Sequence, residues 1–221
     1  MTGTTDLASA TTLHEDSIVA LREILDDPSL PVGTTVEGPD GQRISRLREA
    51  LDHLVTVRAG AAVIESAEAG AHLLRALSVL DTDLADVLDR HVGAVRALSG
   101  VEAGRARNAV LGDVGRGDLI AFASTVRQWN WDEVAPDSVR PLRRAHGEIV
   151  VDDFPGLYDT VLAWHPGIGG LVAISTHRQG LSWEPADGDA ESAHTWVLTL
   201  DAVTFHADDV IPLDHDPRRA Y

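Results

Sequence analysis

Two reactive residue types are missing from this sequence of 221 residues. It has no cysteine, and all eighteen of its basic residues are arginine because lysine is absent as well. The missing cysteine excludes a thiol nucleophile, a disulfide and a thiolate metal site. The missing lysine excludes a lysine Schiff base, a P-loop lysine and an ammonium general base. Chemistry that depends on either side chain is therefore ruled out.

Positive charge is scarce. The formal net charge is -17, with 35 acidic residues against 18 arginines. A surface of this sign argues against binding to nucleic acid or to an anionic membrane surface, because both attract concentrated basic patches. No run approaches the roughly 18 consecutive apolar residues of a membrane-spanning helix, and residues 1–12 lack the basic and apolar segments of a secretory signal. We therefore expect a cytoplasmic protein with no membrane contact.

The residues that are present suffice for a folded core. Hydrophobic residues make up 44% of the sequence, and a chain of this length buries roughly 70% of the surface of its unfolded state. In the first half the apolar residues recur every three or four positions, the spacing of amphipathic helices, with Ser17 as the cap of the first helix. We predict a disordered tail over residues 1–16 and a helical domain over residues 17–116.

After Gly117 the pattern changes to that of short strands. Segments rich in β-branched and aromatic residues alternate with turns that contain Gly, Pro or Asp, and all five tryptophans lie in this half. The strands are predicted at residues 119–125, 149–151, 160–164, 170–175 and 195–205. Residues 117–212 should form a small antiparallel β sheet or barrel, and residues 213–221 a polar tail. The predicted fold class is α+β, a helical bundle followed by an antiparallel β domain.

Five segments carry a resemblance to a known family. They are residues 110–123 (VLGDVGRGDLIAFA), 144–148 (RAHGE), 158–163 (YDTVLA), 180–183 (GLSW) and 200–212 (LDAVTFHADDVIP). In this order they resemble the helix end with the first β strand, the two parts of the central hairpin, a Gly-Leu segment and the last β strand of the acyl-CoA dehydrogenases and their flavin-dependent monooxygenase relatives. The resemblance covers about residues 45–212 and implies the helical and middle β domains of that family.

One departure from the family concerns a whole domain. The family continues into a C-terminal four-helix domain, which carries the glutamate general base of the dehydrogenases and completes the flavin site, whereas this sequence stops nine residues after Pro212. The resemblance thus implies a truncated relative that does not perform the conventional dehydrogenase reaction. Loss of that domain would uncover apolar faces that relatives bury, so we expect a homodimer.

Two further departures fall on positions that hold the flavin in the family. The family's Thr-Glu-x-x-x-Gly-Ser loop has bulky Trp129 and Asn130 here in place of Gly-Ser. Its Trp-Ile-Thr segment, which packs on the flavin, corresponds to Val151, Asp152 and Asp153. Two carboxylates would repel a flavin and its pyrophosphate. We therefore predict no cofactor, with FAD bound together with a partner chain as the alternative.

The substituted positions define a candidate site. The two indoles of Trp129 and Trp131 either line an apolar slot for a small apolar metabolite or fill a core. The adjacent aspartates either supply a general acid or are turn residues before Pro155. The predicted catalytic residues are Asp153, Asp152 and Thr125. The predicted substrate-binding residues are Trp129, Asn130, Trp131, Ser124 and Arg127.

Other types of site find no support in the residue spacing. The histidines of the second half lie on separate segments without a compact His-x-His or His-x-x-x-His pattern, so no metal site is predicted. A Gly-x-Ser-x-Gly elbow for Ser-His-Asp catalysis is absent from the sequence. Residues 167–170 follow a proline and precede a strand, which favours a hairpin turn over a phosphate loop.

Three functions from different classes remain open. The first is an enzyme that folds a small apolar metabolite without redox chemistry, through cyclisation, cycloaddition or isomerisation, because shape and a few polar groups can supply much of such catalysis. The arginine-only, Ala-, Gly- and Asp-rich composition resembles that of high-GC actinobacterial proteins and favours natural-product biosynthesis. The second is a subunit of an FAD-dependent acyl-CoA-dehydrogenase-type oxidoreductase that needs a partner chain. The third is a non-catalytic binding module.

Overall fold

The structure, a computed structural model, describes residues 15–28, 39–56, 67–133, 143–152, 156–165, 167–186 and 195–213. Within these ranges helices precede strands, which confirms the predicted α+β fold class. The chain divides into two compact units, Met1–Arg96 and Ala97–Tyr221. Most of the two predicted tails, residues 1–16 and 213–221, lies outside the described residues.

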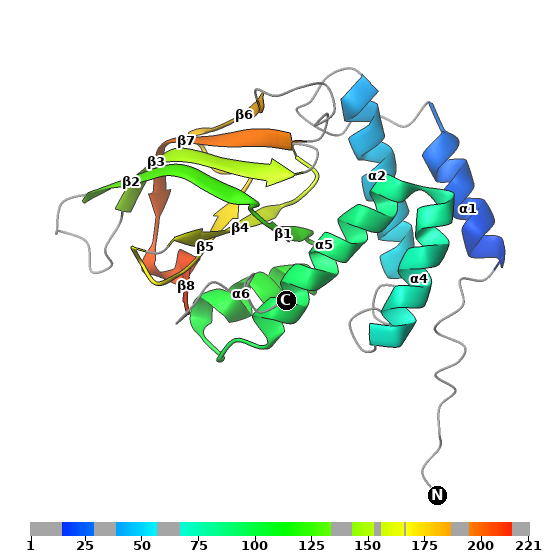
Figure 1. Cartoon of the computed structure of the whole chain (residues 1–221), viewed down its shortest axis with the longest axis horizontal. Coiled ribbons are helices and arrows are strands. Elements are labelled where there is room, and N and C mark those ends of the chain that lie inside the picture. The colour runs from blue at the N-terminus through cyan, green and yellow to red at the C-terminus, as the bar shows by residue number, and fades with distance from the viewer. Residues whose placement is uncertain are drawn as a thin grey trace, which may run out of the picture. The chain divides into compact units, whose positions relative to one another are not determined.

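The described residues of the first unit are helical except for Asp27, Pro28 and Asp81 (Figure 1). Its helices are α1 (Glu15–Asp26), α2 (Pro39–Thr56), α4 (Ala67–Leu80) and α5 (Thr82–Ser99), and α5 runs on into the second unit. Each buries a stripe of aliphatic side chains, as the spacing in the sequence predicts. The first helix already begins at Glu15, so the predicted cap at Ser17 is wrong; acidic residues at 15 and 16 suit the positive end of the helix dipole. In the described part of the chain, no helix combines the length and apolarity that a membrane crossing requires.

An ion-pair cluster joins α2 to the turn between α4 and α5. Arg43 Nη2 lies 2.6 Å from Asp81 Oδ1 and 2.7 Å from Asp83 Oδ2. Asp81 Oδ1 also accepts the backbone N–H of Leu84 at 3.0 Å, which caps the start of α5. Burial alone would lower the pKa of Arg43, but hydrogen bonds to both carboxylates and their charges raise this pKa above its ordinary value. The cluster therefore fixes the connection between two helices.

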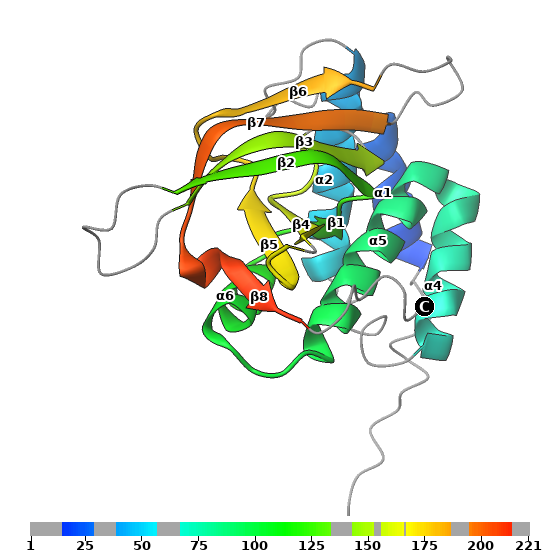
Figure 2. The same ribbon diagram turned by 60° about the vertical axis from the view of Figure 1, so that its left-hand side comes forward.

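The second unit contains α6 (Arg105–Val114), two four-stranded sheets and a short 3-10 helix, η2 (Ala207–Asp209). One sheet has the order β1-β4-β5-β8, built from β1 (Ile120–Phe122), β4 (Thr160–His165), β5 (Gly170–Ser175) and β8 (Val210–Pro212). The other has the order β2-β3-β7-β6, built from β2 (Thr125–Glu133), β3 (Arg143–Asp152), β7 (Thr195–Phe205) and β6 (Leu181–Pro185), whose strands lie side by side in Figure 2. The pairings are antiparallel, as predicted, except that β1 pairs with β4 in parallel.

The change from helix to strand falls between α6 and β1, close to the predicted position at residue 117. The compact units divide earlier, after Arg96. The reason is that α6 packs on β8 and η2, and that Arg105 Nε lies 3.4 Å from Asp208 Oδ2. This helix therefore belongs to the same unit as the strands that follow it.

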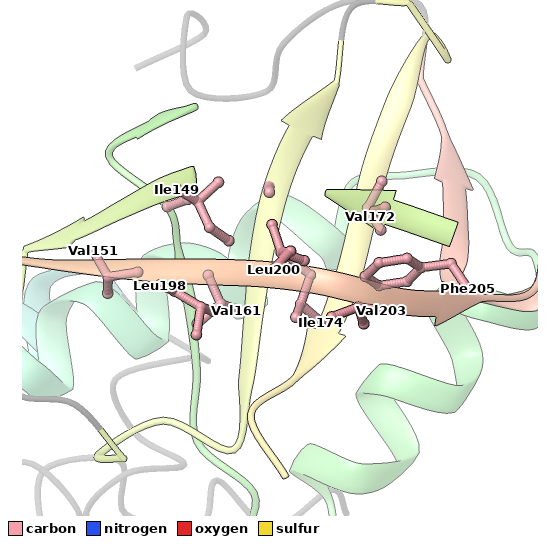
Figure 3. Close-up of a cluster of buried hydrophobic side chains, with 12 residues drawn as sticks. Ile149, Val151, Val161, Val172, Ile174, Leu198, Leu200, Val203 and Phe205 are labelled. Carbon is pink, nitrogen blue, oxygen red and sulfur yellow. The ribbon is translucent and has the colours of Figure 1, made fainter. Parts of the chain in front are cut away.

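Side chains from both sheets form the core of the second unit (Figure 3). The β3 and β7 strands contribute Ile149, Val151, Leu198, Leu200, Val203 and Phe205. The β4 and β5 strands contribute Val161, Val172 and Ile174. All of these side chains are at most 2% exposed. Strands that alternate apolar and polar residues bury one face in this way and leave the other free to carry polar groups.

Candidate functional site

The β2-β3-β7-β6 sheet has two faces of different chemistry. Successive side chains of a strand point to opposite sides of the sheet. The side that carries core residues such as Ile149 and Leu198 is called the inner face here. The opposite side is the outer face, which carries exposed and half-buried polar residues and also the buried side chains of Val150 and Val197. The predicted site residues are divided between these two faces.

Four rings gather on the inner face and form the aromatic cluster: Trp129 and Trp131 of β2, His165 of β4 and Phe205 of β7. The indole centroids of Trp129 and Trp131 lie 5.2 Å apart. Each indole centroid lies within 6.0 Å of the ring centroids of both His165 and Phe205. Tilted and edge-on contacts at such distances are the geometry that aromatic pairs favour. The structure thus brings the two candidate indoles together and packs them against the core.

Small residues on the neighbouring strand provide room for the indoles. Trp129 pairs with Gly147 and Trp131 pairs with Ala145 across the β2–β3 ladder. A Cβ atom on Gly147 would lie 2.1 Å from the carbonyl oxygen of Gln128, so only glycine permits this approach of the two strands. The segment Ala-His-Gly of β3 is therefore matched to the segment Trp-Asn-Trp of β2.

The polar atoms of the aromatic cluster are only partly paired. Trp131 Nε1 donates a hydrogen bond to His165 Nε2 at 3.2 Å. Trp129 Nε1 is buried and has no hydrogen-bond acceptor among the described residues. A buried donor without an acceptor costs on the order of 1–3 kcal/mol. The favourable packing of the Trp129 ring therefore has to offset the free-energy cost of burying its N–H group.

Arg178 contacts the aromatic cluster at the ring of Phe205. Its guanidinium carbon lies 5.0 Å from the centre of the Phe205 ring, and its Nη1 donates to the carbonyl oxygen of Thr204 at 2.9 Å. The same Nη1 donates to Asp209 Oδ2 at 3.0 Å. These contacts join the end of β7 to the last residue of η2 by a cation–π contact and a largely buried ion pair.

On the outer face, Thr125 and Asp152 lie at one end of the sheet. Thr125 pairs with Val150, and Asp152 follows Val150 by two positions on the same side of β3. Ser124 Oγ donates to the carbonyl oxygen of Val150 at 3.0 Å, which fixes the start of β2. Thr125 is exposed and Asp152 is half-buried, so a hydroxyl and a carboxylate face the same way at this corner. Asp153 lies outside the described residues.

The two remaining candidates are exposed. Arg127 lies at an irregularity of β2 where the pairing register with β3 shifts. Asn130 lies between Trp129 and Trp131 in the strand, so the strand period directs its amide away from both indoles and onto the outer face. The structure therefore places the candidate polar groups and the candidate indoles on opposite sides of one sheet.

His146 is an outer-face residue that is not among the site residues predicted from the sequence. It pairs with Asn130, its Nε2 lies 3.2 Å from Asp132 Oδ2, and its Nδ1 lies 3.5 Å from Asp201 Oδ1. In the sequence His146 lies between Ala145 and Gly147, the two small residues that pair with the tryptophans. Strand alternation therefore places His146 on the opposite face. Although one histidine and two aspartates meet here, no group of three or more such side chains in the described ranges could hold a metal ion.

The fold is similar to that of several solved structures, three of which are described here. A glutaryl-CoA dehydrogenase from Mycobacterium smegmatis, in complex with FADH2, is 16% identical over 94% of this chain and 57% of its own, with a TM-score of 0.52. Butyryl-CoA dehydrogenase from Megasphaera elsdenii is 14% identical over 96% and 60%, with a TM-score of 0.54. Methanesulfinate monooxygenase MsuC from Pseudomonas fluorescens is 13% identical over 93% and 52%, with a TM-score of 0.50.

These similarities confirm the predicted acyl-CoA-dehydrogenase-like fold. Identities between 13% and 16% show the fold alone, and the chain spans 52–60% of the length of these three proteins. No family model matches the sequence, and a search of curated proteins gives no match. The dehydrogenase and monooxygenase activities are therefore those of the neighbours.

Proposed function

Starting from an acyl-CoA-dehydrogenase-like fold, we propose that this chain is a flavin-independent enzyme. It would rearrange a small, largely apolar metabolite without net oxidation, by cyclisation, cycloaddition or isomerisation. The observation that carries the proposal is the corner of the outer face where Thr125 and Asp152 face the same way, at positions that the family resemblance assigns to flavin and substrate. The arginine-only composition supports a role in actinobacterial natural-product biosynthesis.

The residues at the flavin-contacting positions do not fit a flavin. Trp129 and Asn130 replace the Gly-Ser that the resemblance implies, and the Trp129 indole packs inward with Trp131 and Phe205. Asp152 presents a carboxylate where the resemblance implies an aliphatic side chain against the flavin. A carboxylate repels the pyrophosphate of the cofactor. The proposed reaction therefore has no flavin step.

An isomerisation illustrates the chemistry that this corner supports. The Asp152 carboxylate would accept a proton from the carbon next to a carbonyl group and return a proton to the carbon two positions further on. The double bond shifts, and no electrons are gained or lost. The Thr125 hydroxyl would donate a hydrogen bond to the carbonyl oxygen, on which charge develops during the shift. Asp153 is the neighbouring candidate for the same proton transfer.

The 3-butenoyl thioester of N-acetylcysteamine is a suitable probe because it carries no phosphate, and its conversion to the crotonyl thioester moves one proton and needs no oxidant. We expect the purified, flavin-free chain to catalyse this shift, and Asp152→Asn to lower kcat by about tenfold or more without lowering the melting temperature. Glu184→Gln removes an exposed carboxylate from β6 of the same sheet and is the matched control. Turnover that requires added FAD, or equal kcat values for the two variants, would contradict the proposal.

A second candidate is a subunit of a flavin-dependent oxidoreductase. It is favoured by the structural neighbour that was solved in complex with FADH2. Such a subunit would bind FAD only together with a partner chain that contributes the missing contacts. Titration of FAD into the chain alone and into its mixture with a co-encoded partner distinguishes the two candidates. If no mixture shows flavin binding or turnover, that result would favour a non-catalytic binding module.

The proposed assembly is a homodimer. In the helical unit, Val79 of α4 is 87% exposed and Val19 of α1 is 49% exposed, and a second copy could cover such side chains. Sedimentation at micromolar concentration measures the assembly directly. A monomer under these conditions would contradict the expectation.

A further inference from the structure

His146 is held between neighbouring strands on the outer face of the β2-β3-β7-β6 sheet. It lies in β3, between β2 and β7, and 41% of its side chain is exposed. Its Nε2 lies 3.2 Å from Asp132 Oδ2 of β2. Its Nδ1 lies 3.3 Å from the backbone nitrogen of Ala202 and 3.5 Å from Asp201 Oδ1, both of β7. One imidazole therefore has partners on both adjacent strands.

The hydrogen bond with Ala202 sets a condition on the protonation of the ring. A backbone N–H is always a donor, so the imidazole nitrogen that it contacts has to be an acceptor and carries no proton. The ring proton then lies on Nε2, from which it is donated to Asp132. The Ala202 hydrogen bond therefore requires a neutral ring with its proton on Nε2.

Protonation of His146 is incompatible with this arrangement. The imidazolium ion carries a proton on each ring nitrogen, so Nδ1–H and the backbone N–H of Ala202 would face each other as two donors. The carboxylate oxygen Oδ1 of Asp201, at 3.5 Å from Nδ1, can accept the new proton. Addition of one proton to Nδ1 would therefore replace the hydrogen bond from the Ala202 N–H by a hydrogen bond to Asp201.

The partner that would be lost belongs to a strained bulge. The β3–β7 register shifts between Ala145 and Gly147, so that Asp201 and Ala202 together face His146. Ala202 has a φ angle of 55°, in the left-handed region that residues other than glycine rarely adopt. A conformation of this kind persists where surrounding contacts hold it, and the His146 hydrogen bond is such a contact.

The bulge also connects the outer face with the aromatic cluster. Toward β6 it is anchored, because the backbone N–H of Asp201 donates to the carbonyl oxygen of Gly180 at 2.8 Å. Along β7 it leads within three residues to Phe205, whose ring contacts Trp129 and Trp131. One short stretch of β7 therefore joins the bulge on the outer face to the aromatic cluster on the inner face.

We infer that His146 is a proton-sensitive latch for the β7 bulge. The neutral ring holds Ala202 in its left-handed conformation, and protonation releases it. Four charged side chains face His146 from β2, β3 and β7: Asp132, Arg144, Glu148 and Asp201. The two aspartates are within reach of the imidazolium, so the protonated state has its own partners. The latch is independent of the proposed enzymatic reaction.

The test uses the full, isotope-labelled chain and nuclear magnetic resonance at about pH 5.5 and about pH 7.5, on either side of the range in which imidazoles titrate. The ring nitrogen shifts of His146 report its tautomer, and hydrogen exchange reports the protection of the Ala202 amide relative to that of Leu198 in the same strand. We expect an unprotonated Nδ1 at the higher pH, and relative protection of Ala202 that falls about tenfold or more at the lower pH.

Two variants separate the latch from a general effect of acid. His146→Gln keeps an acceptor for Ala202 and a donor for Asp132 but does not titrate, so its relative protection should be equal at both pH values. His177→Gln removes another histidine that lies beside a carboxylate, Asp159, and should behave like the unaltered chain. A proton on Nδ1 at the higher pH, or pH-independent protection of Ala202 in the unaltered chain, would overturn the inference. Both of those readouts come from the unaltered chain, so they decide the question even if a variant fails to fold.

Discussion

The inner and outer faces of the β2-β3-β7-β6 sheet are built from the same four strands, yet they differ in composition and in the work they are suited to. The inner face holds aliphatic core residues and the aromatic cluster. The outer face carries Thr125, Asn130, His146 and Asp152. Because side chains alternate, Trp129 and Asn130 are neighbours in the chain but lie on opposite faces. We therefore expect stability to depend on the inner face and chemistry on the outer face.

The largest loss of stability is expected at Phe205. Its side chain is 1% exposed and touches both indoles as well as Arg178. Phe205→Ala should lower the free energy of unfolding by about 3–5 kcal/mol, through lost burial and the cavity that remains. Urea denaturation followed by far-ultraviolet circular dichroism measures this change. A loss below about 1 kcal/mol would remove the aromatic cluster from the account of stability.

A somewhat smaller loss is expected at Trp129, which is only partly buried. Trp129→Ala should lower the free energy of unfolding by about 2–4 kcal/mol, because stacking on three rings is lost, while an N–H group without an acceptor disappears as well. We expect the fold to survive and turnover to fall, since the sheet loses support beneath its outer face. The same denaturation assay, paired with the assay on the 3-butenoyl thioester, checks both statements. Unchanged unfolding and unchanged turnover would refute them together.

Gly147 tests whether the strands need their close approach. A Cβ atom there would lie 2.1 Å from the Gln128 carbonyl oxygen and 2.9 Å from Trp129 Cα. Gly147→Ala should therefore destabilise the chain by about 1–3 kcal/mol, a typical cost of overpacking. Gly93→Ala is the control: at this helical position the added Cβ would meet no described atom within 4 Å apart from the adjoining backbone of its own helix, so the change should stabilise by about 0.5–1 kcal/mol. Effects of the same sign at both positions would contradict this explanation.

The smallest change in stability is expected for Asn130, which lies between Trp129 and Trp131 in the sequence. Asn130 is exposed on the outer face, so Asn130→Ala should change the free energy of unfolding by no more than about 0.5 kcal/mol. Measured beside Trp129→Ala, it compares adjacent positions of one strand that differ in the face they occupy. A loss as large as that of the tryptophan variant would show that the two faces are not separate in energy.

Strands with a strong local signal could be predicted from the sequence. The segments at 170–175 and 195–205 are rich in β-branched and apolar residues and lie between turns, and the structure has strands with those bounds. For the segment Trp-Asn-Trp-Asp the sequence leaves two interpretations open, the wall of an apolar slot and the filling of a core. In the structure it belongs to β2, and its alternation of aromatic and polar residues is the period of a strand with one buried face.

Features that depend on residues far apart in the chain could not be predicted. The parallel pairing of β1 with β4 brings Leu119 to Asp159, whose Oδ2 accepts the Leu119 N–H at 2.9 Å across 40 positions. His146 meets Ala202 across 56 positions, through a bulge for which the local sequence gives no signal. Composition and periodicity specify which face a residue occupies, whereas the partner across the sheet is set by register.

The central claim is that the chain acts without a flavin, and the visible absorption spectrum tests it most directly. The chain is incubated with excess FAD and FMN, separated from unbound flavin by gel filtration, and assayed with the 3-butenoyl thioester of N-acetylcysteamine. The account predicts a protein fraction without a flavin absorption band and with the same turnover as before incubation. A band corresponding to one flavin per chain, with turnover that appears only in that fraction, would contradict it.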